Sequence, residues 1–199
     1  MAEPTVSRAK PPTTGPGGCT PREAAVDPAT TPRSADYLAD CLEACLGYGR
    51  MLAEDIPADR FVCQPLPALN HPAFILGHIT LVTSHALEVL GRPDLARISD
   101  GYRELFEAGC TCEAREERYP PKDQIIAFYE KRHREAAAVI RETSEEALRQ
   151  ENPGSGEKRV RFPTVGALAN FVVNCHHIAH LGQLSAWRRA MGMAGVLRP

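Results

Sequence analysis

The stretch Thr164–Gly192, TVGALANFVVNCHHIAHLGQLSAWRRAMG, decides the fold of this chain of 199 residues. Its apolar residues recur every three to four positions, which is the spacing that places side chains on one face of an α-helix. Thr164 precedes the first apolar residue and is well suited to cap a helix at that point. The stretch therefore predicts one long amphipathic helix that ends near Gly192.

Three earlier segments show the same spacing and begin at typical helix starts. The first begins at Ser34, which we expect to cap it, and ends before Pro57. The second and third open at Pro72 and Pro121, because proline is favoured in the first turn of a helix. No segment has a convincing strand pattern. The sequence thus predicts an all-α chain, most simply a four-helix bundle, and leaves the order of the helices in the bundle open.

The N-terminal segment and two connections differ in composition from the helical segments. Residues 1–33 hold seven of the 17 prolines, with threonine, glycine and alanine between them. Such a segment buries too little apolar surface to offset the entropy of ordering. We therefore expect a disordered tail over residues 1–33 and one domain over residues 34–199. Residues 97–119 are predicted to be a charged loop with at most a helical turn, and residues 152–163 a second loop.

The overall composition excludes several classes of protein. Hydrophobic residues make up 43% of the chain and charged residues 24%, which is typical of a globular domain. The formal net charge is −2, so the chain as a whole lacks the excess of basic residues that is typical of nucleic-acid-binding domains. No apolar stretch approaches the roughly 18 residues that span a bilayer, and residues 1–20 lack the apolar core of a signal peptide. The seven cysteines follow no disulfide framework. We expect a cytoplasmic protein with reduced thiols that binds neither nucleic acid nor membrane.

Two histidines of the C-terminal helix form the most informative pattern. His176 and His180 are four residues apart and stand on the same helix face. Each imidazole there has a donor and an acceptor to satisfy, and charging either ring costs desolvation. A transition metal resolves both problems because it binds the lone pair of the neutral ring. His78, in the middle of the apolar face of the second helix, would supply a third ligand, and three histidines leave coordination positions open, as in reactive metal sites.

Less specific interpretations stay open beside this one. An HxxxH spacing occurs by chance on many helices, and a lone core histidine such as His78 is more often hydrogen-bonded than metal-bound. His177 points away from His176 and is expected at the rim of the bundle or exposed to solvent. His85 is expected in the core or behind a ligand, and His71 in a loop.

Other site chemistries find little support in the sequence. Glu130–His133 is a single ExxH, whereas a di-iron bundle needs two and further glutamates, and the C-terminal helix has no acidic residue. The chain contains no HExxH, P-loop or GxSxG motif. Cys110 and Cys112 have no second cysteine pair, so their spacing is only weak evidence for a separate metal site. One of them could instead supply a fourth ligand to the histidine site, and this alternative stays open. Arg188 is expected in solvent at the end of the last helix.

Two stretches carry a resemblance to a known family. Asn70–Ile79, NHPAFILGHI, looks like the first signature of the DinB-like superfamily, and His176–Leu184, HHIAHLGQL, followed by Trp187–Gly192, WRRAMG, is similar to its second. Thr143–Leu148 also resembles the short turn that precedes the last loop. The resemblance runs from about residue 34 to the C-terminus. It implies a four-helix bundle with a divalent metal held by three histidines.

Carried over residue by residue, the ligands implied by the resemblance are His78, His176 and His180. Zinc or nickel suits such an all-imidazole site best. The family includes thiol-dependent S-transferases, so one function that the resemblance implies is the activation of a low-molecular-weight thiol for transfer to a small electrophile. The alternative is a non-catalytic binding or stress-response module whose metal is structural or vestigial. The catalytic residues stay unassigned, and a homodimer is left open.

Overall fold

The computed structural model describes residues 31–197, which form helices and no β-strand, with one isolated bridge between Glu151 and Thr164. This confirms the predicted all-α fold. Within the same residues, every helix is too short or too polar to cross a membrane. In chain order the elements are α1 (Ser34–Ala53), η1 (Ala58–Arg60), α2 (Pro72–Val89), α3 (Asp100–Phe106), η2 (Glu116–Arg118), α4 (Lys122–Glu142), α5 (Glu145–Arg149), α6 (Gly156–Arg161), α7 (Val165–Asn170), η3 (Phe171–His176) and α8 (His177–Ala190).

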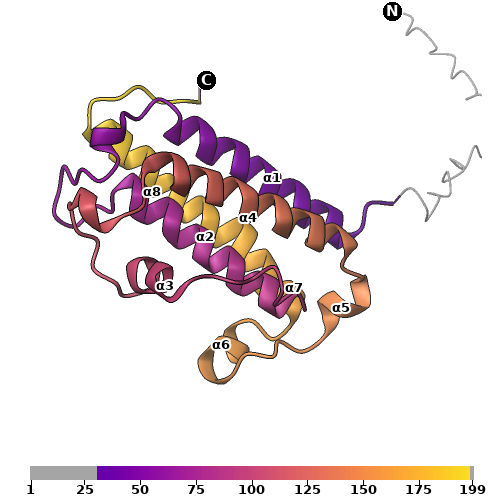
Figure 1. Ribbon diagram of the computed structural model, residues 1–199. Helices are drawn as coiled ribbons and strands as arrows, with labels where there is room; N and C mark the ends of the chain where they lie inside the picture. The colour runs from indigo at the N-terminus through magenta and orange to yellow at the C-terminus, as the bar shows by residue number, and fades with distance from the viewer. Residues whose placement is uncertain (1–30, 198–199) are drawn as a thin grey trace, which may run out of the picture. The chain divides into compact units, whose positions relative to one another are not determined.

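Four rods form the bundle, namely α1, α2, α4 and a composite of α7, η3 and α8 (Figure 1). Helix α4 packs along both α1 and α2, and α8 packs against the same two helices on the other side. The cyclic order is therefore α1, α4, α2, α8, which settles the arrangement that the sequence leaves open. The main core includes Leu81 of α2, Tyr129 of α4 and Trp187 of α8, all almost fully buried.

Helices α2 and α7 begin where the sequence predicts, α4 begins one residue after the expected Pro121, and α1 has a different cap. Ser144 and Thr164 cap α5 and α7, since each hydroxyl accepts a hydrogen bond from a backbone N–H three residues on, at 3.1 Å. Pro72 occupies the first turn of α2. The expected cap at Ser34 is wrong, because Arg33 holds that position and its N–H donates to the Asp36 carboxylate at 2.9 Å.

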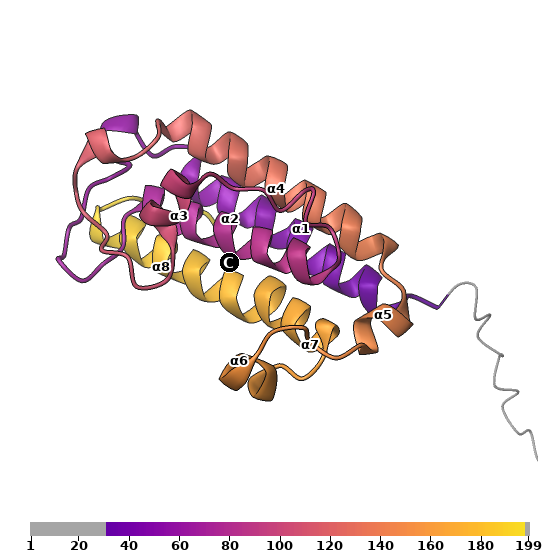
Figure 2. The ribbon, with the colours of Figure 1, turned by 60° about the horizontal axis from the view of Figure 1, so that its bottom comes forward.

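The two predicted loops contain short helices that the sequence does not signal. Residues 97–119 include α3 and η2, and Phe106 at the end of α3 is fully buried in the main core. The predicted loop over residues 152–163 includes α6, which Figures 1 and 2 place beside α7. The predicted tail, residues 1–33, lies outside the described residues except for its last three, so it stays a prediction.

The C-terminal rod departs from the continuous α-helix that the sequence predicts. Residues Phe171–His176 form the π-helical turn η3, in which N–H groups bond to carbonyls five residues back. The His177 side chain adds a similar contact, because its Nδ1 lies 2.7 Å from the carbonyl oxygen of Val172, also five residues back. The turn ends at His176, the first histidine of the HxxxH pair, and π turns of this kind frequently mark functional sites.

Arg188 on α8 is buried rather than solvated, contrary to expectation. Its side chain is 2% exposed and donates to the carbonyl oxygens of Leu52 at 2.9 Å and Ala194 at 3.0 Å. It also pairs with the Asp55 carboxylate through two hydrogen bonds, one of them 2.9 Å long. This side chain therefore ties the end of α1 and the C-terminal segment to α8.

Candidate metal centre

Three histidine side chains from two rods meet at one point of the bundle. His78 comes from α2, His176 is the last residue of η3, and His180 lies one turn further along α8. One nitrogen from each ring falls within 4.8 Å of the other two. The ring centroids are 5.2 Å apart for His78 and His176, 4.8 Å for His78 and His180, and 4.5 Å for His176 and His180. The structure thus brings together all three residues that the sequence singles out.

The spacing of these nitrogens fits a metal ion. A tetrahedral ion with metal–nitrogen bonds of about 2.1 Å holds neighbouring nitrogens about 3.4 Å apart. The Nε2 atoms of His78 and His176 are 3.3 Å apart. This pair therefore has the spacing of neighbouring ligands in a metal centre, and a nitrogen of His180 lies within 4.8 Å of both.

Hydrogen bonds behind two of the rings orient them toward the shared point. His78 Nδ1 donates to the carbonyl oxygen of Phe106 at 2.7 Å, and His180 Nδ1 donates to Gln183 Oε1 at 3.2 Å. A ring that donates from Nδ1 keeps its lone pair on Nε2, which is the atom a metal needs. His176 differs, since its Nδ1 is buried without any hydrogen-bond partner. The ring of His176 is therefore held by contacts such as that with the ring of Phe171, 5.9 Å away between centroids, and not by a hydrogen bond from Nδ1.

Burial keeps these rings in the form that binds metal. Desolvation lowers the pKa of His176 from its ordinary value of 6.5 to about 3, and that of His180 to about 4. Both rings are therefore neutral at pH 7. The cluster contains no carboxylate and no thiol. A divalent ion held by three neutral rings keeps its full formal charge, so an anion is a favoured further ligand.

The site lies at the edge of the bundle and not inside its core. His78 is 7% exposed, whereas His176 and His180 are half-buried. Gln183, whose side chain lies against the ring of His180, is exposed. One side of the cluster is therefore accessible, which is the condition for an open coordination position.

The two cysteines that could close the site do not reach it. Among residues 31–197, the side chains grouped at this point are the three histidines, without Cys110 or Cys112. The Cys110 thiol instead donates to the carbonyl oxygen of Glu104 at 3.2 Å. In this geometry the site offers three candidate protein ligands, all of them histidines.

A second histidine pair was missed by the sequence interpretation. His177, expected at the rim, is fully buried, and its Nε2 lies 2.5 Å from Nε2 of His133 on α4. The Thr83 hydroxyl of α2 is 3.4 Å from both rings, so the contact joins three of the rods. The signal available was the position of His133, which shares a helix face with the apolar residues Tyr129 and Ala136.

The remaining two histidines serve other purposes. His71 lies in the connection just before α2, as expected, but it is fully buried and caps the helix, because its Nδ1 accepts from the N–H of Phe74 at 3.1 Å. His85 lies two turns along α2 from His78 and accepts a hydrogen bond from Arg103 at 2.8 Å. Neither joins the cluster.

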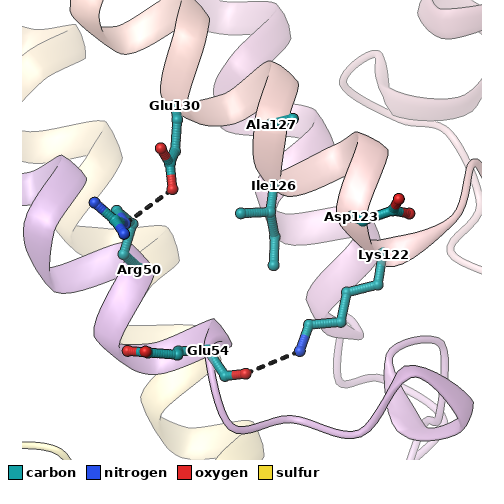
Figure 3. Close-up of a pocket in the computed structure, with 7 residues that line it drawn as sticks. All are labelled: Arg50, Glu54, Lys122, Asp123, Ile126, Ala127 and Glu130. Atoms are coloured by element: carbon teal, nitrogen blue, oxygen red, sulfur yellow. Dashed lines mark hydrogen bonds and ion pairs between the residues drawn. The ribbon is translucent and has the colours of Figure 1, made fainter.

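The groove drawn in Figure 3 lies between α1 and α4 and has a volume of about 540 Å³. Its walls are held by an ion pair between Arg50 and Glu130 at 2.8 Å and by a hydrogen bond from Lys122 to the carbonyl oxygen of Glu54 at 3.0 Å. It takes no residue from the histidine cluster. The groove therefore gives no reason to look for the reactive site on this face.

Comparison with known proteins agrees with the histidine geometry. The sequence pattern of one family, described as the DinB superfamily, matches residues 42–184. This range includes His78, His176 and His180, and it covers most of the bundle. No curated protein sequence matches the chain with significance.

Proposed function

The chain belongs to the DinB superfamily, and we propose that it holds one divalent metal ion on His78, His176 and His180 and transfers a low-molecular-weight thiol to a small electrophile. The observation that carries the proposal is the convergence of three imidazole nitrogens within 4.8 Å on a half-buried site with one accessible side. Zinc and nickel are the ions that suit this donor set best.

The residues of the chain divide the task between them. When bound at such a site, a divalent ion supplies the positive charge that lowers the pKa of a thiol and makes it a thiolate at neutral pH. The Phe106 carbonyl and Gln183 hold the rings of His78 and His180 in place. The lack of a carboxylate in the cluster preserves the attraction for an anionic sulfur.

A thiol titration of the cobalt-substituted protein tests this function. Glutathione or 2-mercaptoethanol should produce sulfur-to-cobalt charge-transfer absorption in the wild type. The same band should appear in the Cys110→Ser, Cys112→Ser double variant and be absent from His180→Ala. A band that is present before any thiol is added, and that vanishes in the double variant, would show a site closed by cysteine. That result favours the non-catalytic module with a structural metal.

A further inference from the structure

A small hollow opens directly beside the histidine cluster. It has a volume of about 220 Å³ and lies against the second half of α2, the segment after α3, and the run from α6 to η3. His78 and His176 form part of its wall, so anything bound in it lies next to the candidate metal centre. The other lining residues are Val82, His85, Ala86, Val89, Glu107, Ala108, Lys158, Phe162, Leu168, Phe171 and Val172.

The apolar part of this wall is a cluster separate from the main core. Ala86, Leu168 and Val172 are buried together, and partly buried side chains, including those of Phe162 and Phe171, pack around them. The two phenyl rings lie 4.4 Å apart between centroids, and the ring of Phe171 lies 5.9 Å from that of His176. An apolar surface thus reaches from the mouth of the hollow to the metal ligands.

The polar residues of the hollow carry no net charge. Lys158 and Glu107 contribute one formal charge of each sign. His85 accepts a hydrogen bond from Arg103, and burial lowers its pKa, so its ring is neutral at pH 7. The walls of the hollow therefore favour a neutral occupant. The positive charge of the neighbouring metal site would be balanced by the thiolate of the proposed function and not by the occupant of the hollow.

The volume limits the size of the occupant. A dry apolar cavity of about 150 Å³ holds one benzene molecule. The hollow, at about 220 Å³, has room for one ring with a short substituent. We propose that this hollow binds a neutral compound with a single aromatic ring and places it beside His78 and His176 as the electrophile that receives the thiol. The thiolate forms a C–S bond to an electrophilic carbon of this compound, the bond from that carbon to its leaving group or epoxide oxygen breaks with its electron pair, and the released group takes up the proton that the thiol lost to solvent. The inference rests on the proposed function for the role of the occupant, but not for its binding.

Fluorine NMR with two matched probes tests the inference on the full-length protein. The neutral 4-fluorobenzyl alcohol should bind to the metal-free, zinc-loaded and cobalt-loaded forms, and the anionic 4-fluorobenzoate should bind about tenfold more weakly to the metal-free form, a difference of about 1.4 kcal/mol. Cobalt should broaden the signal of the bound alcohol far more than zinc does, because the paramagnetic ion adjoins the hollow.

Two variants fill the hollow, and one serves as a control. Ala86→Leu and Val89→Phe both add side-chain volume inside it, and each should weaken binding of the alcohol about tenfold or more. The control, Ala127→Leu, makes the same alanine-to-leucine change in the exposed groove of Figure 3 and should leave binding of the alcohol unchanged. Circular dichroism identifies any variant that fails to fold. If one filling variant fails to fold, binding of the alcohol to the other filling variant tests the inference.

The outcomes separate this inference from the proposed function. Failure of the metal-free protein to bind the alcohol, tighter binding of the benzoate to that form, or unchanged binding in a folded filling variant would each overturn the inference and leave the thiol titration untouched. Equal broadening by cobalt and zinc in fully loaded protein would overturn it as well. Failure to load cobalt counts against the proposed function, while binding to the metal-free form still decides the inference.

Discussion

Replacing Gly77 by alanine should loosen both the fold and the metal site, because the ring of Phe106 lies directly on this glycine. A Cβ added at Gly77 would lie 2.6 Å from Cζ of Phe106 and closer still to Cδ1 and Cε1. Carbon atoms need about 3.5 Å of separation, so the ring would have to move by about 1 Å. Phe106 is fully buried and packs against Phe74, Tyr102 and Tyr119, which leaves it little room.

The magnitude follows from two opposing effects on the free energy of unfolding. Alanine is favoured over glycine inside a helix by about 1 kcal/mol. Overpacking of a buried site costs about 1–3 kcal/mol, and a ring with no room to move belongs at the upper end. We expect a net loss of about 2 kcal/mol, or roughly 4–8 °C in Tm for a chain of this size.

The same displacement reaches the metal site through the backbone. The carbonyl oxygen of Phe106 accepts the hydrogen bond from His78 Nδ1 at 2.7 Å, and a shift of Phe106 weakens that bond. Loss of a partner behind a metal ligand typically lowers metal affinity about 10–100-fold. The Gly77→Ala variant should therefore bind zinc more weakly by about that factor in a chelator competition.

Gly47 on α1 offers a matched control, because a Cβ there meets nothing within 4 Å. Gly47→Ala should raise Tm by roughly 2–4 °C and leave zinc affinity unchanged. Thermal melts of the metal-free proteins followed by circular dichroism measure the first effect, and chelator competition measures the second. A Gly77→Ala protein as stable as Gly47→Ala, with wild-type zinc affinity, would refute the reasoning.

Three further predictions concern the rest of the bundle. Arg188→Ala should lower the free energy of unfolding by about 2 kcal/mol in urea titrations, because it leaves the carbonyl oxygens of Leu52 and Ala194 without their buried donor. Arg189→Ala at an exposed position should change it by less than about 0.5 kcal/mol, and equal effects would contradict the burial of Arg188. Desolvation lowers the pKa of His71 from 6.5 to about 4, so between these pH values the unfolded chain binds a proton there that the folded chain does not. The free energy of unfolding of the metal-free protein should therefore fall from pH 6.5 to 4 by up to about 1.4 kcal/mol per pH unit for this residue. In urea titrations at both ends of the range, the His71→Asn protein, which keeps a capping oxygen, should lose less stability than the wild type. Removal of residues 1–31 should leave Tm within a few degrees of the full chain, because the proline-rich segment offers little apolar surface, and a large loss of helical signal would contradict the domain boundary.

The features that could be predicted from the sequence are those with local signals. Pro72, Ser144 and Thr164 mark helix starts through their own chemistry, and all three do so in the structure. His176 and His180 share a helix face because of a four-residue spacing, which holds although His176 is the last residue of the π turn. His78 could be proposed from its place on the apolar face of the second helix, and the bundle places it against both.

The features that could not be predicted depend on contacts between elements. The hydrogen bond that orients His78 comes from a backbone carbonyl at Phe106, and a carbonyl leaves no trace in the sequence. His177 is buried because α8 packs on more than one neighbour, so a residue off the cluster face still points into the bundle. Arg188 is buried for a similar reason, since two carbonyls and Asp55 satisfy it at a position where charge alone suggests solvent.

Metal content of the purified protein tests the central claim most directly. Elemental analysis after dialysis should find about one divalent ion per chain in the wild type and in His85→Ala, whose ring lies outside the cluster. His176→Ala and His180→Ala should each lose stoichiometric metal while keeping their helical circular dichroism, because two remaining imidazoles bind too weakly. Full occupancy in both of these variants, or loss of metal in His85→Ala alone, would contradict the assignment of the metal to His78, His176 and His180.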